Sequence, residues 1–180
     1  MYDYILKRRL ERYYQKNSRE KRFLNLKDIH TVLVLFDTAG FREASMCINR
    51  LEGLGKKLTV YAYQKKKDRR DYSGTRYHII SQKAAGKWFG NPMYTIAEKL
   101  KEETFDAVID LTVRRNIPLE YLLAYASAPV KTGLKKNNFP QYDLSIINLP
   151  DAENIRVEEL GRQILYYLDS IQSASASVRG

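Results

Sequence analysis

Hydrophobic residues form short uninterrupted runs along the middle of the chain. The first run, Thr31–Phe36, is rich in β-branched residues and leucine and shows no polar alternation. A run of this kind is typical of a strand that is covered on both faces of a sheet. Similar runs predict further strands at residues 57–63, 77–80, 105–111, 130–134 and 144–149.

Between these runs, hydrophobic residues recur with the period of an amphipathic helix. The clearest helix spans residues 41–54, and Gly53 and Gly55 suit its C-terminal cap. Asn91-Pro92 and Asn116 are typical residues for the start of a helix. A last helix is predicted at residues 157–171.

The two ends of the chain differ from this central pattern. Residues 2–22 predict an amphipathic helix with a narrow apolar stripe, which we expect to pack on the domain or on a second subunit of a homo-oligomer. Residues 173–180 lack a core-forming pattern and are expected to be disordered. The sequence therefore divides into a basic N-terminal helix (1–29), one α/β domain (30–172) and a tail (173–180).

The alternation of strands and helices predicts a three-layer, Rossmann-like α/β domain, with helices on both faces of a mostly parallel sheet of about five to six strands. The segment 77–80 has no helix before it, so it either returns as a hairpin or lies at an edge. In open parallel sheets, ligands bind beyond the carboxyl ends of the strands. We expect this edge to gather residues 37–41, 64–76, 110–118 and 133–140.

The net charge of +10 is concentrated in two segments. Residues 1–22 hold eight Lys or Arg against three acids, and residues 64–76 hold six against two, whereas the remainder is nearly neutral with 17 against 16. Patches of one sign attract nucleic acid, anionic lipid, phosphorylated ligands or acidic proteins. The alternative is that both segments are solvated surfaces.

We expect neither a membrane span nor a secretory signal in this sequence. An apolar run of about 18 residues, which a membrane span requires, does not occur, and the N-terminus lacks the apolar core of a signal peptide. Cys47 is the only cysteine, so no internal disulfide can form. We therefore expect a cytoplasmic protein.

Two nucleotide-binding motifs are absent. Asp37-Thr38-Ala39-Gly40 is similar to the magnesium switch of GTPases, but the glycine-rich phosphate loop that such enzymes need is missing. A dinucleotide fingerprint needs three glycines after the first strand, and only Gly40 is present. We therefore expect no cofactor.

Asp37 and Asp110 end two predicted neighbouring strands, so both carboxylates could face one crevice. As a pair they could bind magnesium or exchange protons. The simpler interpretation, which we favour, is that Asp37 caps a helix and that Asp110 accepts hydrogen bonds from loop amides. His30 and His78 are isolated, so the sequence predicts no metal site.

Paired arginines at the end of a strand are the strongest candidates for ligand binding. Arg114 and Arg115 follow Asp110, and two guanidinium groups can fork onto a phosphate or carboxylate. The alternative is a pair of solvated arginines, or one arginine stacked on a tyrosine. Glycines allow close approach of a ligand to the backbone. The predicted anion contacts are Arg114, Arg115, Lys65, Lys66, Arg69 and Arg70, with Gly40 and Gly133 giving close approach.

The order of several segments resembles that of an uncharacterised family of short bacterial proteins. These segments are Trp88–Pro92, Phe105–Leu111, Pro118–Leu122, Ala128–Gly133 and Tyr142–Leu144. The resemblance covers most of residues 30–170 and implies an α/β fold. It implies no activity, because that family has none established.

A second, fainter resemblance is to the N-terminal half of the ADP-heptose lipopolysaccharide heptosyltransferases. It rests on the first strand and turn, the strand Phe105–Leu111, the small-residue helix that follows and a strand reaching Gly133. That family has a Gly-Asp turn after its first strand and needs a second Rossmann-like domain, whereas this chain has Asp37–Gly40 and is expected to contain one domain. The resemblance therefore supports the fold and argues against transferase activity.

These observations favour a non-catalytic binding or assembly module with an electropositive crevice for an anionic, phosphorylated ligand or an acidic partner. The alternative is an enzyme acting on a nucleotide or sugar phosphate, similar to a degenerate glycosyltransferase, with Asp37 and Asp110 as acid–base or metal groups. Single-stranded nucleic-acid binding is a third alternative, because several of the 14 tyrosines lie among the basic residues.

Overall fold

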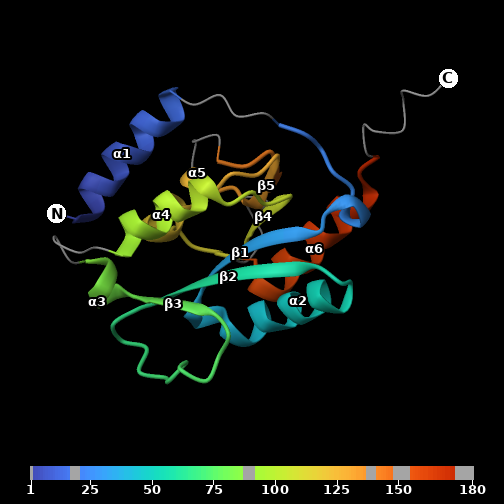
Figure 1. The fold of residues 1–180 in the computed structure, drawn as a ribbon. Coiled ribbons are helices and arrows are strands. Elements are labelled where there is room, and N and C mark those ends of the chain that lie inside the picture. The colour runs from blue at the N-terminus through green and yellow to red at the C-terminus, as the bar shows by residue number, and fades with distance from the viewer. Residues whose placement is uncertain (1, 17–20, 87–91, 137–140, 148–154, 173–180) are drawn as a thin grey trace.

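The computed structural model describes residues 2–16, 21–86, 92–136, 141–147 and 155–172 (Figure 1). The tail 173–180, whose disorder the sequence predicts, lies outside these residues. Within the described residues, six parallel strands form one sheet in the order β3-β2-β1-β4-β5-β6. Their bounds are β1 Thr31–Asp37, β2 Lys57–Gln64, β3 His78–Ser81, β4 Ala107–Asp110, β5 Val130–Leu134 and β6 Leu144–Ile146.

Helices cover both faces of this sheet, so the predicted three-layer, Rossmann-like fold is confirmed. Two helices lie on one face of the sheet (Figure 1). The other face carries the N-terminal helix, the two helices between β3 and β4, and the helix between β4 and β5. The first group is α2 (Phe41–Gly53) and α6 (Val157–Ser170); the second is α1 (Tyr2–Lys16), α3 (Gln82–Ala85), α4 (Pro92–Glu102) and α5 (Ile117–Tyr125).

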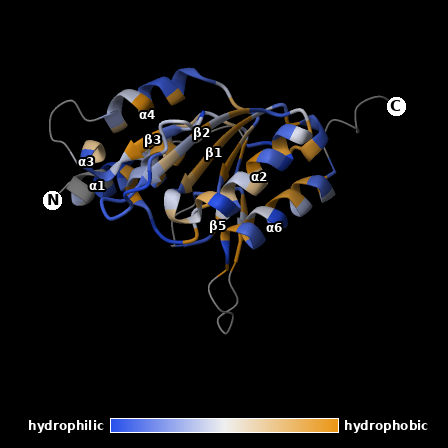
Figure 2. Cartoon of the chain, turned by 90° about the horizontal axis from the view of Figure 1, so that it is seen from below, coloured by the Kyte–Doolittle hydropathy of each residue, from blue (hydrophilic) through white to orange (hydrophobic). Residues whose placement is uncertain are grey.

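Two hydrophobic cores follow from this layering. Alternate residues of β1 point to opposite faces, so that Val32, Val34 and Phe36 join one core while Leu33 and Leu35 join the other. In Figure 2 the hydrophobic colour concentrates on the strands, and α2 and α6 present hydrophilic residues outward. Burial of both faces explains why the strand sequences show no polar alternation.

The edge strand β3 corrects one part of the sequence interpretation. It pairs parallel with β2, so the hairpin alternative is wrong and the edge position is right. A parallel pair needs a crossover connection, and residues 65–77 supply it as a loop rather than as a helix. Of the predicted strand 144–149, the structure gives Leu144–Ile146 as β6; residue 147 is not in the strand, and residues 148 and 149 lie outside the described residues.

The N-terminal helix packs against the body of the same chain. Leu10 is buried, and the Tyr13 ring lies 4.7 Å from the Tyr125 ring of α5. The Arg9 guanidinium lies 4.7 Å from the Tyr94 ring. The described part of the helix runs to Lys16, residues 17–20 lie outside the described residues, and residues 21 and 22 are not helical.

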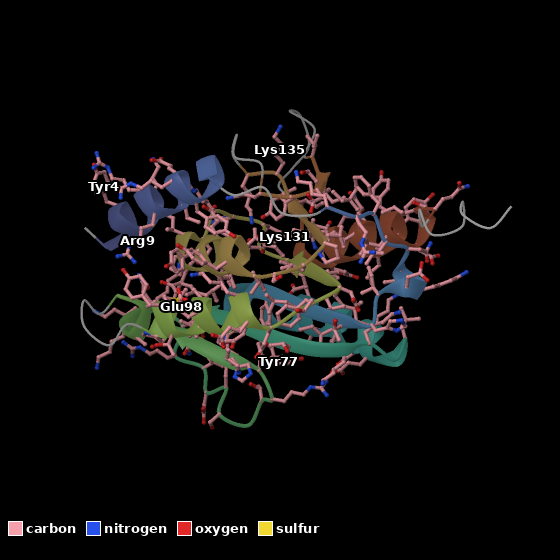
Figure 3. All side chains as sticks on the ribbon, turned by 45° about the horizontal axis from the view of Figure 1, so that its top comes forward. Tyr4, Arg9, Tyr77, Glu98, Lys131 and Lys135 are labelled. Carbon is pink, nitrogen blue, oxygen red and sulfur yellow. The ribbon has the colours of Figure 1, made fainter. Side chains whose placement is uncertain are left out.

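A buried lysine fixes the end of α5 to the sheet. Lys131 on β5 is 3% exposed, and its Nζ donates hydrogen bonds to the carbonyls of Leu123 at 2.6 Å and Ala124 at 3.1 Å. Cations are favourable at helix C-termini, where backbone carbonyls lack partners. Figure 3 shows Lys131 in the interior, whereas Tyr4 and Arg9 lie on the outer helix α1. This contact holds α5 in place, and the start of α5 borders the site described below.

Candidate functional site

The strand order reverses between β1 and β4. The chain leaves β1 toward β2 and leaves β4 toward β5, on the opposite side. The loops that follow the two strands therefore diverge, which is where ligands bind in folds of this kind. Asp37 ends β1 and Asp110 ends β4, so the structure places both at this switch point.

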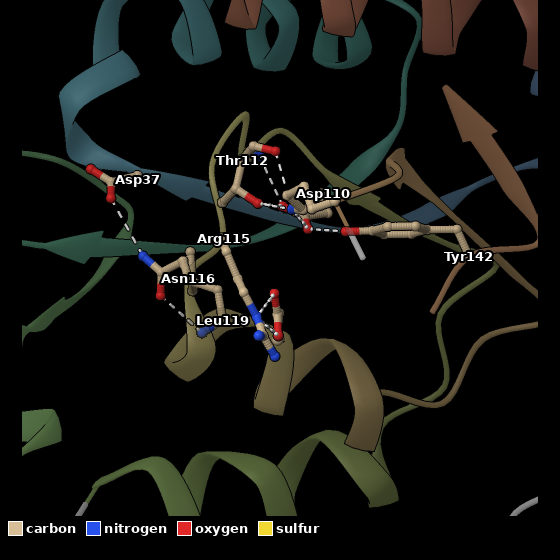
Figure 4. A network of polar contacts seen from close by, with 9 residues as sticks. Asp37, Asp110, Thr112, Arg115, Asn116, Leu119 and Tyr142 are labelled. Carbon is tan, nitrogen blue, oxygen red and sulfur yellow. Dashed lines mark hydrogen bonds and ion pairs between the residues drawn. The ribbon is translucent and has the colours of Figure 1, made fainter. Parts of the chain in front are cut away.

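Asp37 joins three segments at this point, and Figure 4 shows its contact with Asn116. One carboxylate oxygen accepts a hydrogen bond from the Ala39 amide at 3.0 Å, which caps the 3-10 turn Thr38–Gly40. The other oxygen lies 3.1 Å from Lys65 Nζ and accepts a hydrogen bond of 3.4 Å from Asn116 Nδ2. Asp37 thus links the basic loop to the segment that carries Arg114 and Arg115.

Asp110 is the centre of a separate, buried network (Figure 4). Its Oδ1 accepts hydrogen bonds from the Thr112 amide at 2.8 Å and the Thr112 hydroxyl at 2.6 Å. Its Oδ2 accepts hydrogen bonds from Lys136 Nζ at 2.8 Å and from the Tyr142 hydroxyl at 2.5 Å. The side chains of Asp110 and Lys136 are 1% and 4% exposed, so this ion pair is shielded from water.

The space beside Gly133 and Gly40 is occupied by side chains of the protein itself. A Cβ atom at Gly133 would lie 2.6 Å from Tyr142 Cε1 and 3.1 Å from Asp110 Cβ. A Cβ atom at Gly40 would lie 2.7 Å from Val157 Cγ2. The sequence prediction that these glycines admit a ligand is therefore corrected: they admit Tyr142 and Val157.

The basic loop is held in shape by Asp68. This carboxylate accepts hydrogen bonds from the Thr38 hydroxyl at 2.7 Å, from Arg70 Nη2 at 2.8 Å and from the Tyr72 hydroxyl at 2.8 Å. The hydrogen bond from Arg70 holds the pKa of Asp68 well below its usual range. Arg70 also donates to the Thr38 carbonyl at 2.8 Å, so it holds the loop against the turn that follows β1.

We predict that Asp68→Ala loosens this loop while the fold remains intact. The variant removes the acceptor that Thr38, Arg70 and Tyr72 share, and loops with few remaining contacts open locally. Limited digestion with trypsin should then cut within residues 64–76 faster than in the wild type. Asp71→Ala is the matched control because Asp71 bonds only to Ser73 in the described structure. Equal cleavage of both variants would contradict the role of Asp68.

The six predicted anion contacts fall into two groups. Lys65 pairs with Asp37, Arg70 pairs with Asp68, and Arg115 pairs with Glu120. The second group comprises exposed cations without an ion-pair partner among the described residues: Arg114, Lys66 and Arg69. Arg115 belongs partly to both groups. Its side chain is 35% exposed, and its hydrogen bonds to Glu120 come from Nε alone.

Sequence reasoning missed several residues of this site. Lys136 and Tyr142 reach Asp110 across 26 and 32 residues, and no local pattern signals such contacts. Glu120 follows a typical helix start, yet it is 1% exposed and its partner is Arg115. Burial raises the pKa of Glu120, and the charge of Arg115 opposes this rise.

Among the described residues, the candidate nucleophiles and metal ligands do not form a cluster. The described residues contain no group of three or more His, Cys, Asp or Glu that could hold a metal ion. His78 stacks on Tyr61 with the ring centroids 4.8 Å apart. Cys47 is buried in α2, and burial raises the pKa of its thiol to about 11, so the thiol remains neutral.

A cavity of about 410 Å³ lies at the opposite, amino edge of the sheet. Its lining includes residues that precede β4 and β5, together with side chains from α1, α4 and α5. The lining residues are Tyr13, Arg22, Lys101, Thr104, Tyr125, Ala126, Ser127, Ala128 and Pro129. This cavity is remote from the switch point and provides a natural alternative location for a ligand.

Comparison with known proteins identifies the family. Residues 3–171 match the family of unknown function DUF6913, and the chain belongs to that family. This result confirms the resemblance to an uncharacterised family. No curated protein matches the sequence.

One solved structure shows a similar arrangement of the chain. It is a glycosyl transferase family 9 protein from Veillonella parvula DSM 2008, with 14% sequence identity and a TM-score of 0.49. The alignment covers 83% of this chain and 43% of that protein, so the chain spans less than half of its length.

Among the described residues, every helix is too short or too polar to cross a membrane.

Proposed function

We propose that this protein is a non-catalytic binding module that receives an anionic, phosphorylated group at the carboxyl edge of its sheet. The group belongs either to a small ligand or to a partner protein. One observation carries the proposal: Asp37, Asp68, Asp110 and Glu120 each pair with a cation, while Arg114, four residues after Asp110, is exposed and has no ion-pair partner among the described residues. This edge therefore keeps positive charge that none of these four carboxylates neutralises.

The contacts of Asp37 support convergence of the basic segments. Asp37 bonds to Lys65 in the loop 64–76 and to Asn116, which directly follows Arg114 and Arg115. Asp37 thus links two segments that are distant in the sequence and that both carry cations. A guanidinium group can make two parallel hydrogen bonds to a phosphate, which gives geometric specificity as well as charge attraction.

The enzyme alternative needs Asp37 and Asp110 to act together. In the structure they have no hydrogen-bond or ion-pair partner in common, and Asp110 is enclosed by Thr112, Lys136 and Tyr142. A carboxylate bonded in this way is poorly placed to take a proton from a substrate, because its oxygens are already engaged. These contacts favour a binding role.

The free buried Cys47 is compatible with the reducing conditions of the cytoplasm, where we expect the protein to act.

Calorimetric titration with pyrophosphate tests this proposal. The double variant R114A/R115A is expected to weaken binding by at least about tenfold, since the loss of even one hydrogen bond to a charged group costs about 1.5–3 kcal/mol and about 1.4 kcal/mol corresponds to tenfold. The matched control is R156A/R162A, which removes the same charge from exposed arginines beside α6. Unchanged binding in R114A/R115A, or equal weakening in the two double variants, would refute the assignment.

A further inference from the structure

The Arg115–Glu120 pair places one guanidinium group between a buried carboxylate and the solvent. Glu120 lies in the first turn of α5 and is 1% exposed. Both of its carboxylate oxygens accept from Arg115 Nε at 3.2 Å. The Nη atoms of Arg115 make no hydrogen bond with the described residues, and the side chain is 35% exposed. Arg115 can therefore contact an anion while it still contacts Glu120.

Few other charges influence Glu120. Lys136 lowers its proton affinity and Asp110 raises it, but these two residues are bonded to each other. Two cations of the neighbouring helices contact aromatic rings instead: Arg9 of α1 lies over Tyr94, and Lys101 of α4 lies over Tyr125. Arg115 is thus the main support for a negative charge on Glu120, while burial opposes that charge.

We propose that Glu120 positions Arg115 for anion binding, and that binding of an anion at Arg115 is coupled to uptake of a proton by Glu120. This inference rests on the proposed function, because it concerns the same site. It adds a residue that acts through Arg115, and it adds a dependence on pH.

The sign of the coupling follows from the shared charge. An anion on the Nη atoms of Arg115 lowers the positive potential at Glu120, so the carboxylate becomes harder to keep ionised and its proton affinity rises. Linkage is reciprocal, so protonation of Glu120 must strengthen anion binding by the same factor. Affinity should therefore increase as pH falls toward the ordinary Glu value of about 4.3.

Sulfate is the suitable probe, because its charge is constant over this range whereas phosphate itself titrates. We would measure its dissociation constant by calorimetry between about pH 5 and pH 8. Repeating each titration in buffers of different ionisation enthalpy gives the number of protons taken up. The wild type should take up a fraction of a proton, and log Kd should rise with pH by up to about one per pH unit.

Glu120→Gln should abolish the proton uptake and flatten the pH profile while binding is retained. Glu120→Asp should restore part of the pH dependence, which a purely structural role of the side chain does not predict. Glu159→Gln is the matched control, because Glu159 also pairs with an arginine but lies exposed on α6. It should leave the profile unchanged.

The outcomes separate this inference from the proposed function. If the wild type binds sulfate through Arg115 without proton uptake, the coupling to Glu120 is wrong and the binding site stands. The coupling is also wrong if Glu120→Gln keeps the wild-type pH slope. If the wild type binds neither sulfate nor pyrophosphate at any pH, the proposed function fails and this inference fails with it. The number of protons that the wild type takes up on binding sulfate tests the coupling even if a variant does not fold.

Discussion

Replacing Asp110 with alanine should lower the free energy of unfolding by about 3–5 kcal/mol, because it leaves a buried charge without its partner. Lys136 is 4% exposed, and Asp110 is its ion-pair partner at 2.8 Å. The same change removes the acceptor of the Tyr142 hydroxyl and of the Thr112 amide. Urea unfolding followed by circular dichroism measures the loss.

Two further variants test whether the buried pair causes this loss. Glu98→Ala removes an exposed ion pair with Lys101 of similar length, and it should cost less than about 1 kcal/mol. The double variant D110A/K136M should be more stable than D110A alone, since it no longer buries an unpaired ammonium group. A cost for D110A as small as that of the exposed pair would show that the network does not hold the carboxyl edge together.

Gly133→Ala should destabilise the protein by about 1–3 kcal/mol through overpacking. The added methyl group would lie 2.6 Å from Tyr142 Cε1 and 3.1 Å from Asp110 Cβ. The tyrosine ring cannot move away freely, because its hydroxyl is bonded to Asp110 at 2.5 Å. Gly133 does not have a positive φ, so the expected cost is steric and is measured by the same unfolding experiment.

Gly74→Ala provides the control, because no atom lies within 4 Å of the added methyl group and the φ of Gly74 is not positive. It should change stability by less than about 0.5 kcal/mol. In a Tyr142→Ala background the cost of Gly133→Ala should largely vanish, since the ring that causes the clash is gone. Equal costs in the two backgrounds would contradict the packing explanation.

The sheet and its helices could be predicted because their signals are local. The run Thr31–Phe36 is apolar on both faces, and the structure buries it on both faces as β1. The direction of β3 could not be predicted, because no helix precedes its four residues. A loop does not indicate whether the strand that follows it runs parallel or antiparallel to the strand before it. The loop 65–77 joins β3 to β2, and Asp68 in that loop bonds to Thr38 and Arg70.

The candidate site could be predicted only in part. Asp37 and Asp110 were recognisable because each ends an apolar run, and strand ends converge in a parallel sheet. Their partners were not recognisable, since Lys136 follows β5 and Tyr142 precedes β6, and no local pattern links either residue to Asp110. A glycine in a strand indicates close approach, but the sequence does not say that Tyr142 is what approaches Gly133.

Backbone amide chemical shifts, followed by NMR during a titration with pyrophosphate, test the anion-binding edge most directly. We predict that the perturbed amides cluster at residues 37–42, 64–76 and 110–118, which meet around Asp37. Perturbations centred on Lys101, Thr104 and residues 125–129 would place the ligand in the cavity at the amino edge instead. That pattern, or the absence of any saturable change, would contradict an anion site at the carboxyl edge.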